Sequence, residues 1–269
     1  MSHATRYITP VPETTAIRLG AVTKSYNTHY NPSANDYPWS GYAVSAQQNP
    51  GFTNLKWTFV QGEWTVPHGH TYCQSSTDAS FDSPWVGLGG DGWDGGTGNL
   101  IQDGTITYNH NPAPASYFWW YNYYTGDGSG LQLAKNVPIA PGDDAYTSVT
   151  YNGNLTSTFF FENVSSGVYF SLPKATSHVD LTAADFINED QPASWDFVNF
   201  GTVPFKSEFM SGSWGNGYSI SKVLSDSINL SSFTSYKNGG DTPSHKVAWP
   251  TAVDGNGNFT DYATPNDGC

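Results

Sequence analysis

Two polar residues in apolar surroundings are the first candidates for chemistry in this sequence. Glutamate is scarce, with five in 269 residues, and Glu189 lies within Phe-Ile-Asn-Glu-Asp-Gln-Pro, three residues before Pro192. Glu162, in Phe-Phe-Phe-Glu-Asn-Val, has a comparable apolar setting. Gln102 directly follows a Leu-Ile pair. A carboxylate in such a place can serve as a general acid or base, but for each residue taken alone a surface position beside a turn is the better expectation.

Other chemical motifs are incomplete. Residues 68–73 hold two histidines and a cysteine, but no second cluster with ligand spacing follows. Asp91, Asp94 and Asn99 could approach a Ca²⁺ ion, yet they lack the calcium-loop pattern and its final glutamate. The chain has no Gly-x-Ser-x-Gly nucleophile motif and no phosphate-binding loop. We therefore expect neither a metal ion nor a cofactor.

The pattern along the chain predicts an all-β protein. Aromatic residues make up 16% of the chain, Gly (28) and Pro (17) are frequent, and no long stretch has helical periodicity. Apolar and polar residues alternate over Trp57–Val66 and stop at Pro67. Residues 68–83 are predicted to form a polar loop, and Glu-Asn-Val-Ser-Ser-Gly at 162–167 a hairpin-like turn. Further short strands follow about every ten residues, which indicates a single-domain β-sandwich of jelly-roll type over residues 38–269. Residues 1–37 are predicted to form an extended arm or the remnant of a pro-segment.

The stretch 85–104 is predicted to divide into several parts. Residues 85–88 form a core strand, residues 89–98 a Gly-rich loop, and residues 99–102 a second short strand. Asp-Gly at 103–104 then forms a tight turn, and a short strand covers residues 105–109. A later strand, residues 116–126, holds seven aromatic residues in eleven. Aromatic side chains on both faces of one strand indicate burial on both sides or an aromatic-walled cleft.

The formal net charge of −13 and pI near 4.6 argue against nucleic acid and anionic membranes as partners. With 10 Lys+Arg and 7 His, full protonation of the carboxylates leaves at most 10 + 7 = +17, which limits charge repulsion in acid. The composition therefore favours a protein that acts in acid. We also expect the protein to be secreted and monomeric. No apolar run is long enough to span a membrane. Cys73 and Cys269 allow one disulfide or two free thiols.

Seven segments in order resemble the glutamic peptidases, or eqolisins. The family's Trp-Val-Gly-Ile-Asp-Gly and Leu-Gln-Thr-Gly segments resemble the stretch from Trp85 to Gly104. Its Ala-Glu-Trp-Ile-Val-Glu-Asp resembles residues 184–190. The other five resemblances are Trp-Ser-Gly-Tyr-Ala-Val at 39–44, Val-Gln-Gly-Glu-Trp-Thr-Val-Pro at 60–67, the aromatic strand, Ala-Pro-Gly-Asp at 140–143 and Glu-Asn-Val-Ser-Ser-Gly at 162–167. Two family carboxylates are replaced, by Gly89 and Asn122.

The resemblance implies two large bent antiparallel sheets with an active-site groove on the concave face. It places Gln102 on the family's catalytic glutamine and Glu189 on its catalytic glutamate. It implies an endopeptidase that hydrolyses protein or peptide substrates with an activated water, without a covalent intermediate. The groove is expected to bind substrate through Trp39, Trp120, Tyr121, Asn122 and Asp91. Because Asn122 is neutral, we expect the pH profile to differ from that of the family.

Two alternatives remain open. A jelly-roll glycoside hydrolase would use an aromatic-lined cleft and two carboxylates, but a second partner for Glu189 is hard to name among so few glutamates. A carbohydrate-binding module without catalytic activity would also suit the many aromatic residues.

Overall fold

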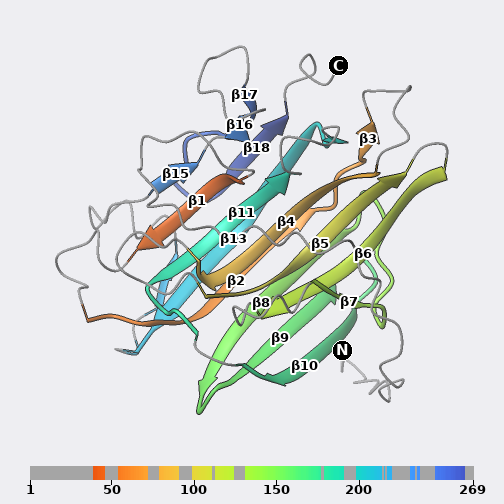
Figure 1. Ribbon diagram of the computed structural model, residues 1–269. Helices are drawn as coiled ribbons and strands as arrows, with labels where there is room; N and C mark the ends of the chain where they lie inside the picture. Colours follow the sequence, from red (N-terminus) through yellow and green to blue (C-terminus); the bar gives the residue numbers. More distant parts are fainter. Residues whose placement is uncertain are drawn as a thin grey trace, which may run out of the picture.

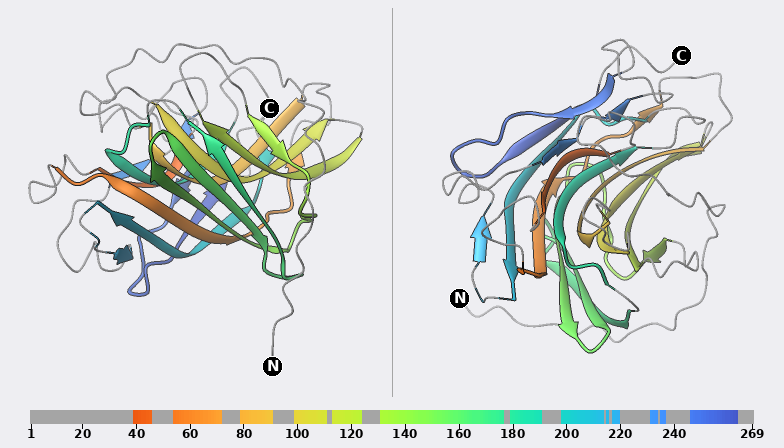
Figure 2. Two further views of the ribbon diagram at one scale, coloured as in Figure 1. Left: turned by 90° about the horizontal axis from the view of Figure 1, so that it is seen from below. Right: turned by 60° about the vertical axis from the view of Figure 1, so that its left-hand side comes forward.

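The all-β prediction is confirmed. The computed structural model describes residues 39–45, 54–71, 79–90, 99–110, 113–123, 131–176, 179–190, 198–213, 215, 217–219, 231–233, 235–236 and 246–263 of the 269. These residues form two large antiparallel sheets that stack as an open sandwich (Figure 1). Both sheets are twisted and curved (Figure 2). Within these ranges, no helix has the length and apolarity needed to cross a membrane.

The first sheet has seven strands and carries the predicted catalytic residues. Its strands, in spatial order, are β15 (Ser231–Phe233), β1 (Trp39–Ser45), β11 (Ala183–Asp190), β4 (Ala79–Gly89), β5 (Leu100–His110), β6 (Ala113–Tyr123) and β7 (Gln132–Ala134). Strand β11 is far from β4 in the sequence, yet it pairs directly with β4 on one side and with β1 on the other.

The second sheet has nine strands. Its order is β10 (Val168–Ala175), β9 (Thr156–Asn163), β8 (Asp144–Gly153), β2 (Trp57–Thr65), β13 (Thr202–Gly212), β18 (Phe259–Ala263), β17 (Lys246–Pro250) and β16 (Ser235–Tyr236), with β14 (Gly217–Ser219) paired to β13. A separate two-stranded ribbon joins β3 (His70–Thr71) to β12 (Val198–Asn199). The alternation predicted over Trp57–Val66 is β2, and the predicted 162–167 turn joins β9 to β10.

The main hydrophobic core lies between the two sheets. Both sheets contribute fully buried aromatic side chains to it, including Trp119 from β6 and Trp64, Phe161 and Phe205 from the second sheet. A second, smaller cluster consists of side chains of the seven-stranded sheet only, namely Ala43, Trp85, Leu100, Ile106, Trp120 and Ile187. Because neighbouring residues of a strand point to opposite faces, this cluster lies on the face turned away from the second sheet, which we call the outer face.

The predicted turn at Asp103-Gly104 is wrong. Residues 100–110 form the single strand β5, and Gly104 pairs with Trp85 of β4. A Cβ atom on Gly104 would meet the Pro84 carbonyl oxygen at 2.2 Å, so glycine is needed there for close strand approach. The predicted loop over residues 68–83 is also too long, because β4 already begins at Ala79.

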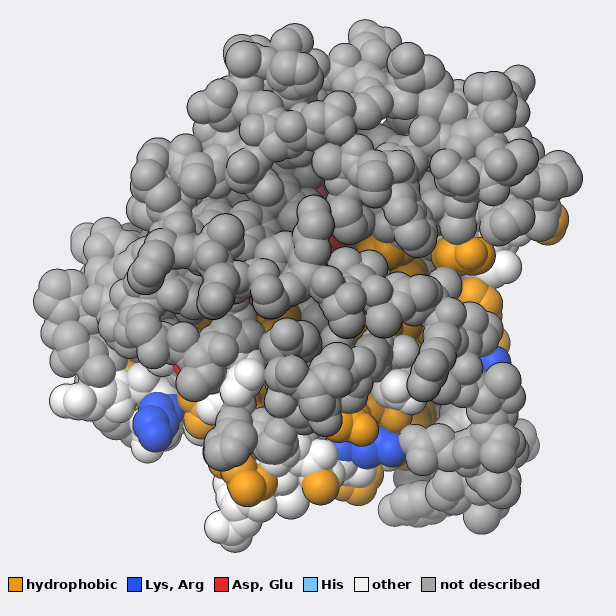
Figure 3. Space-filling model, in the orientation of Figure 1, with side chains coloured by type: hydrophobic (Ala, Val, Ile, Leu, Met, Phe, Trp, Pro, Cys, Tyr) orange, Lys and Arg blue, Asp and Glu red, His pale blue; other side chains and the backbone are white. Residues whose placement is uncertain are grey.

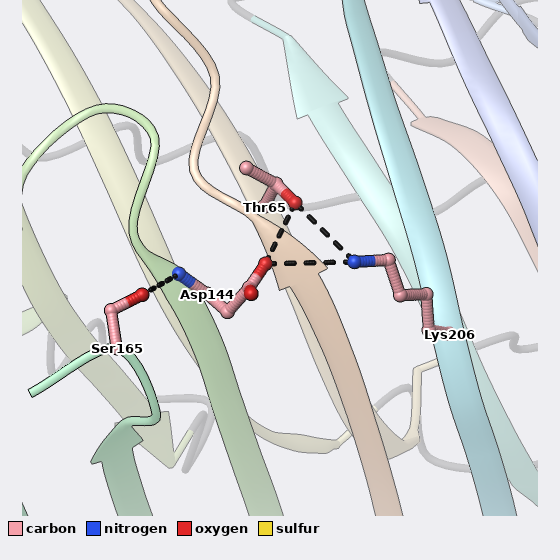
Figure 4. Close-up of polar contacts among 4 residues, drawn as sticks. All are labelled: Thr65, Asp144, Ser165 and Lys206. Atoms are coloured by element: carbon pink, nitrogen blue, oxygen red, sulfur yellow. Dashed lines mark hydrogen bonds and ion pairs between the residues drawn. The ribbon is translucent and has the colours of Figure 1, made fainter. Parts of the chain in front are cut away.

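Polar contacts link three strands on the exposed side of the second sheet (Figure 4). Lys206 Nζ of β13 lies 3.5 Å from Asp144 Oδ1 of β8, and Thr65 Oγ1 of β2 donates to the same oxygen at 2.8 Å. The Asp144 backbone N–H donates to Ser165 Oγ at 2.8 Å. Exposed ion pairs of this kind add little stability, so the apolar core holds the sandwich together. The arm over 1–37, Cys73 and Cys269 lie outside the described residues.

Candidate functional site

Gln102 and Glu189 lie on the same outer face of the seven-stranded sheet, on strands that flank β4. Glu189 of β11 pairs with Ser83 of β4, and Gln102 of β5 pairs with Gly87 of β4. Ser83, Trp85 and Gly87 therefore share a face with both residues, since strand side chains alternate. The Trp85 side chain lies on β4 between the positions of the two predicted catalytic residues.

Two indole rings surround the Glu189 carboxylate. Trp85 Nε1 donates a hydrogen bond to Glu189 Oε2 at 3.1 Å. Trp39 of β1 pairs with Glu189 across the strands, and its ring meets the Trp85 ring edge-on, with centroids 5.1 Å apart and planes at 79°. Burial in these surroundings raises the pKa of Glu189 from 4.5 to about 7, although hydrogen bonds from the Trp85 and Trp39 side chains oppose that rise.

Gln102 presents an amide with unused hydrogen-bonding capacity. Its side chain is 8% exposed, and within the described part of the chain its buried Oε1 has no hydrogen-bond partner. Asn122 of β6 pairs with Gln102, and its buried Oδ1 likewise has no partner among the described residues. Buried polar atoms normally have partners. The two amides are therefore suited to bind a water molecule or a polar group of a ligand.

The other predicted substrate-binding residues divide between the two faces. Trp120 lies on the outer face with Gln102, and its Nε1 donates to the Thr105 carbonyl oxygen at 3.2 Å. Tyr121 lies on the opposite face, where it is 3% exposed and packs on Phe159 with ring centroids 5.2 Å apart. This placement gives no support to a substrate contact by Tyr121. Asp91 lies outside the described residues.

Trp85 and Asp185 were not predicted as site residues. Trp85 is fully buried and opens an apolar run, so the sequence pattern predicts only a core strand. Trp85 is two residues from Gly87, the partner of Gln102, so strand alternation could have placed Trp85 on the same face as Gln102. Asp185 is also fully buried on this face, where it pairs with Gly87. Asp185 and Glu189 are four residues apart on β11, and this even spacing could have placed Asp185 on the same face as Glu189.

Gly87 makes room for the Trp85 ring. A Cβ atom at this position would lie 2.9 Å from Trp85 Cζ3 and 3.0 Å from Leu100 Cδ1. The Trp85 indole therefore extends over Gly87 at its benzo end, while its N–H reaches Glu189. The rigid Trp85 ring thus extends from Gly87, the residue that pairs with Gln102, to the Glu189 carboxylate.

The described surface visible in Figure 3 mixes hydrophobic side chains with uncharged polar and backbone atoms, and Lys side chains appear toward its lower and right-hand margins. Within the described residues, no group of three His, Cys, Asp or Glu side chains is placed to hold a metal ion. This face of the sheet therefore presents a carboxyl group whose pKa burial raises to about 7, together with amide groups that can donate and accept hydrogen bonds.

Comparison with known proteins identifies the family. Residues 37–237 match the peptidase A4 family. The fold is similar to that of scytalido-glutamic peptidase solved with a transition state analog inhibitor, with a TM-score of 0.63 and 18% identity over 85% of this chain and 98% of that one. It is also similar to SCP-B, an eqolisin solved with the tripeptide Ala-Ile-His (TM-score 0.61, 18% identity, 85% and 98% coverage).

Aspergilloglutamic peptidase from Aspergillus niger is similar as well, with a TM-score of 0.53 and 20% identity over 68% of this chain and 99% of that one. A search of curated protein sequences finds no match. The glycoside hydrolase and carbohydrate-binding alternatives gain no support from these comparisons. The resemblance to the eqolisins is confirmed: the chain belongs to the peptidase A4 family and is a hydrolase of peptide bonds.

Proposed function

We propose that the protein is a glutamic endopeptidase in which Glu189 and Gln102 form the catalytic dyad. The observation that carries this proposal is their position on one face of one sheet, on the two strands that flank β4. The partly buried carboxylate and the nearly buried amide supply a proton acceptor and a hydrogen-bond donor on the same surface.

In the proposed reaction, ionised Glu189 removes a proton from a water molecule, whose oxygen attacks the carbonyl carbon of the peptide bond. The Gln102 amide N–H donates to the oxygen that becomes negatively charged, and its carbonyl helps to orient the water. Glu189 then returns the proton to the departing amine nitrogen, and the C–N bond breaks. Glu189 is thus ionised again at the end of the cycle, and no covalent bond forms between enzyme and substrate.

The pKa of Glu189, raised to about 7, bears on the working pH. A carboxyl that titrates there is ionised in only about one molecule in a thousand at three units lower pH, and the mechanism needs the ionised form. We therefore propose that activity rises from weakly acidic pH toward neutrality. The acid range predicted from composition then describes the tolerance of the fold rather than the optimum of the reaction.

We propose protein or peptide substrates, bound across the outer face by Trp39, Trp120 and Asn122. Aromatic rings on this face suit apolar substrate side chains, and the Asn122 amide suits a backbone group. The low content of Lys and Arg and the acidic composition support an extracellular monomer without nucleic-acid or membrane partners.

Digestion of a protein substrate in the presence of pepstatin, across acid and neutral pH, tests the dyad. Glu189→Gln should lower kcat/KM by about 10²- to 10⁴-fold because it removes the base. Gln102→Ala should lower it by about 10²- to 10³-fold because it removes an oxyanion donor. Full activity in either variant contradicts the assignment.

Matched controls come from the second sheet. Glu162→Gln and Gln61→Ala remove a glutamate and a glutamine from β9 and β2, away from the outer face of the seven-stranded sheet. The Gln61 amide accepts from Tyr146 Oη at 3.0 Å and donates to the Ser207 carbonyl at 3.3 Å, so its loss carries a structural cost of its own. Both control variants should keep kcat/KM near the wild-type value.

A further inference from the structure

We propose that Trp85 is a positioning residue that fixes the Glu189 carboxylate and helps to set its protonation. The proposal rests on the proposed catalytic role of Glu189. Its basis is the hydrogen bond from Trp85 Nε1 to Glu189 Oε2 at 3.1 Å, made by a side chain that is fully buried. An indole N–H is a donor only, so it can stabilise the carboxylate but cannot accept its proton.

Neighbouring residues hold the Trp85 ring in one orientation. Gly104, its partner on β5, has no side chain, and a Cβ there would lie 2.7 Å from the Trp85 Cβ. Gly87 leaves space at the other end of the ring, where a Cβ would lie 2.9 Å from Cζ3. Trp39 closes the remaining side with its edge-on contact. The ring is therefore preorganised, and the donor does not have to be reoriented during the reaction.

Both indoles act on the same carboxylate. Oε2 accepts from Trp85 and is held in place by that contact, and the Trp39 side chain also donates to the carboxylate. Removal of the indole N–H should both loosen the carboxylate and destabilise its ionised form.

Among the residues that the structure describes, no charged group takes over the role of the indoles. The residues that face Glu189 are Trp39 on β1 and Ser83 and Trp85 on β4, and none of them is charged. Of the nearby carboxyls, Asp82 neighbours Ser83 and points to the inner face, while Asp185 lies four residues away on β11. Asp190 follows Glu189 and pairs with Asp82. The pKa of Glu189 responds mainly to burial, with the two indoles opposing it.

The test is Trp85→Phe, which keeps an aromatic ring and removes the N–H. The acid limb of the kcat/KM profile should move up by about one pH unit, the size expected for one hydrogen bond to a charged group. On that limb, kcat/KM at fixed pH then falls about tenfold. Loss of packing alone would admit water and move the limb down, because hydration favours the ionised carboxylate. An unmoved or lowered limb overturns the proposal.

Trp64→Phe is the matched control. Trp64 is also fully buried, and its Nε1 donates to Thr105 Oγ1 at 2.9 Å, but it lies between the sheets. This variant loses the same kind of hydrogen bond at a distance from the carboxylate. It should lose stability as Trp85→Phe does while the acid limb stays in place. An equal displacement of the limb in both variants contradicts the proposal.

An NMR titration separates this proposal from the catalytic assignment. The Trp85 indole ¹⁵N–¹H resonance should shift with pH in the wild type, with a midpoint of about 7, and should stop shifting in Glu189→Gln. If the resonance titrates but Glu189→Gln remains active, the indole contact stands and the dyad is wrong. If Glu189→Gln is inactive but the wild-type resonance does not titrate, the contact proposal is wrong and the dyad stands.

Discussion

Glu189 is governed by two opposing effects within a few ångströms. Burial among apolar residues disfavours its charge and raises its pKa, whereas the indole donors favour the charge and lower the pKa. The result is a carboxyl whose two protonation states are close in free energy near pH 7. A group in this condition can accept a proton from water and release it again within one catalytic cycle.

Gly87→Ala tests the need for space beneath the Trp85 ring. The added methyl would lie 2.9 Å from Trp85 Cζ3, so the ring must move and its hydrogen bond to Glu189 must lengthen. We expect kcat/KM to fall about tenfold, as for loss of one charge-assisted hydrogen bond. Steady-state kinetics measures this loss.

Gly62→Ala is the control for that substitution. Its methyl would lie 2.9 Å from Val86 Cγ1, a crowding of the same size between the sheets. It should lower the free energy of unfolding but leave the kinetics of the folded enzyme unchanged. If Gly87→Ala behaves as Gly62→Ala does, the position of the Trp85 ring is unimportant for catalysis.

Asn122→Glu tests the effect of the neutral residue beside Gln102. A carboxylate placed opposite Gln102 adds a like charge to the face that carries Glu189, which disfavours ionisation of Glu189. The acid limb of the kcat/KM profile should therefore move to higher pH, while the neutral variant Asn122→Gln should leave it in place. An unchanged limb in Asn122→Glu would show that the charge at position 122 does not influence the base.

At the scale of elements, strand β4 determines how the site is assembled. It lies between β11 and β5, and its registers with both strands set the spacing of Glu189 and Gln102. It also supplies Trp85 and Gly87 to the surface between them. Strand alternation assigns alternate residues of β6 to opposite faces, which explains why Trp120 and Asn122 lie near Gln102 while Tyr121 is in the core.

The hairpin between β8 and β9 contains backbone strain that is independent of the site. Asn154 and Leu155 both have left-handed φ, at 52° and 57°, and Leu155 is 49% exposed. This conformation costs a residue with a Cβ atom about 1–2 kcal/mol, and an exposed side chain returns little by packing. Leu155→Gly should therefore raise the free energy of unfolding by about 1 kcal/mol in urea titrations. Leu155→Ala keeps the Cβ atom and should give no such gain.

Several elements could be predicted from the sequence because they follow local rules. Alternation over residues 57–66 predicts β2, and a turn sequence at 162–167 predicts the hairpin of β9 and β10. Gly104 was misread because glycine after aspartate usually marks a turn, whereas here it allows close packing against Pro84. Which strands lie side by side depends on contacts between distant segments, so Glu189 could be joined to Gln102 only through the family resemblance.

At the scale of the whole molecule, buried carboxyl groups make stability depend on pH. Burial raises the pKa of Glu208 from 4.5 to about 8, and it raises the pKa values of Asp82 and Asp103 well above their usual range. Asp82 lies near Asp261 of the second sheet, whose charge adds to the rise in its pKa. These groups stay protonated in the folded state at pH values where the unfolded chain releases their protons.

The sign of this effect follows from linkage. A carboxyl whose pKa is raised by folding contributes its full stability below the unfolded pKa near 4.5, and that stability is lost as pH rises through the folded value of about 8. We expect the urea concentration at the unfolding midpoint to decrease as the pH is raised from 4.5 to 8. The decrease should be smaller in Glu208→Gln. A urea midpoint that increases toward pH 8 contradicts this account. So does a Glu208→Gln variant whose midpoint decreases with pH as steeply as that of the wild type.

The most direct test of the central claim is the pH dependence of kcat/KM for a peptide substrate, measured in the wild type and in Glu189→Gln with pepstatin present. If ionised Glu189 is the base, the wild-type profile rises along an acid limb with an apparent pKa of about 7, and Glu189→Gln loses both the limb and the activity. A wild-type optimum in strong acid, or a limb near pH 7 that persists in an active Glu189→Gln enzyme, would contradict the account.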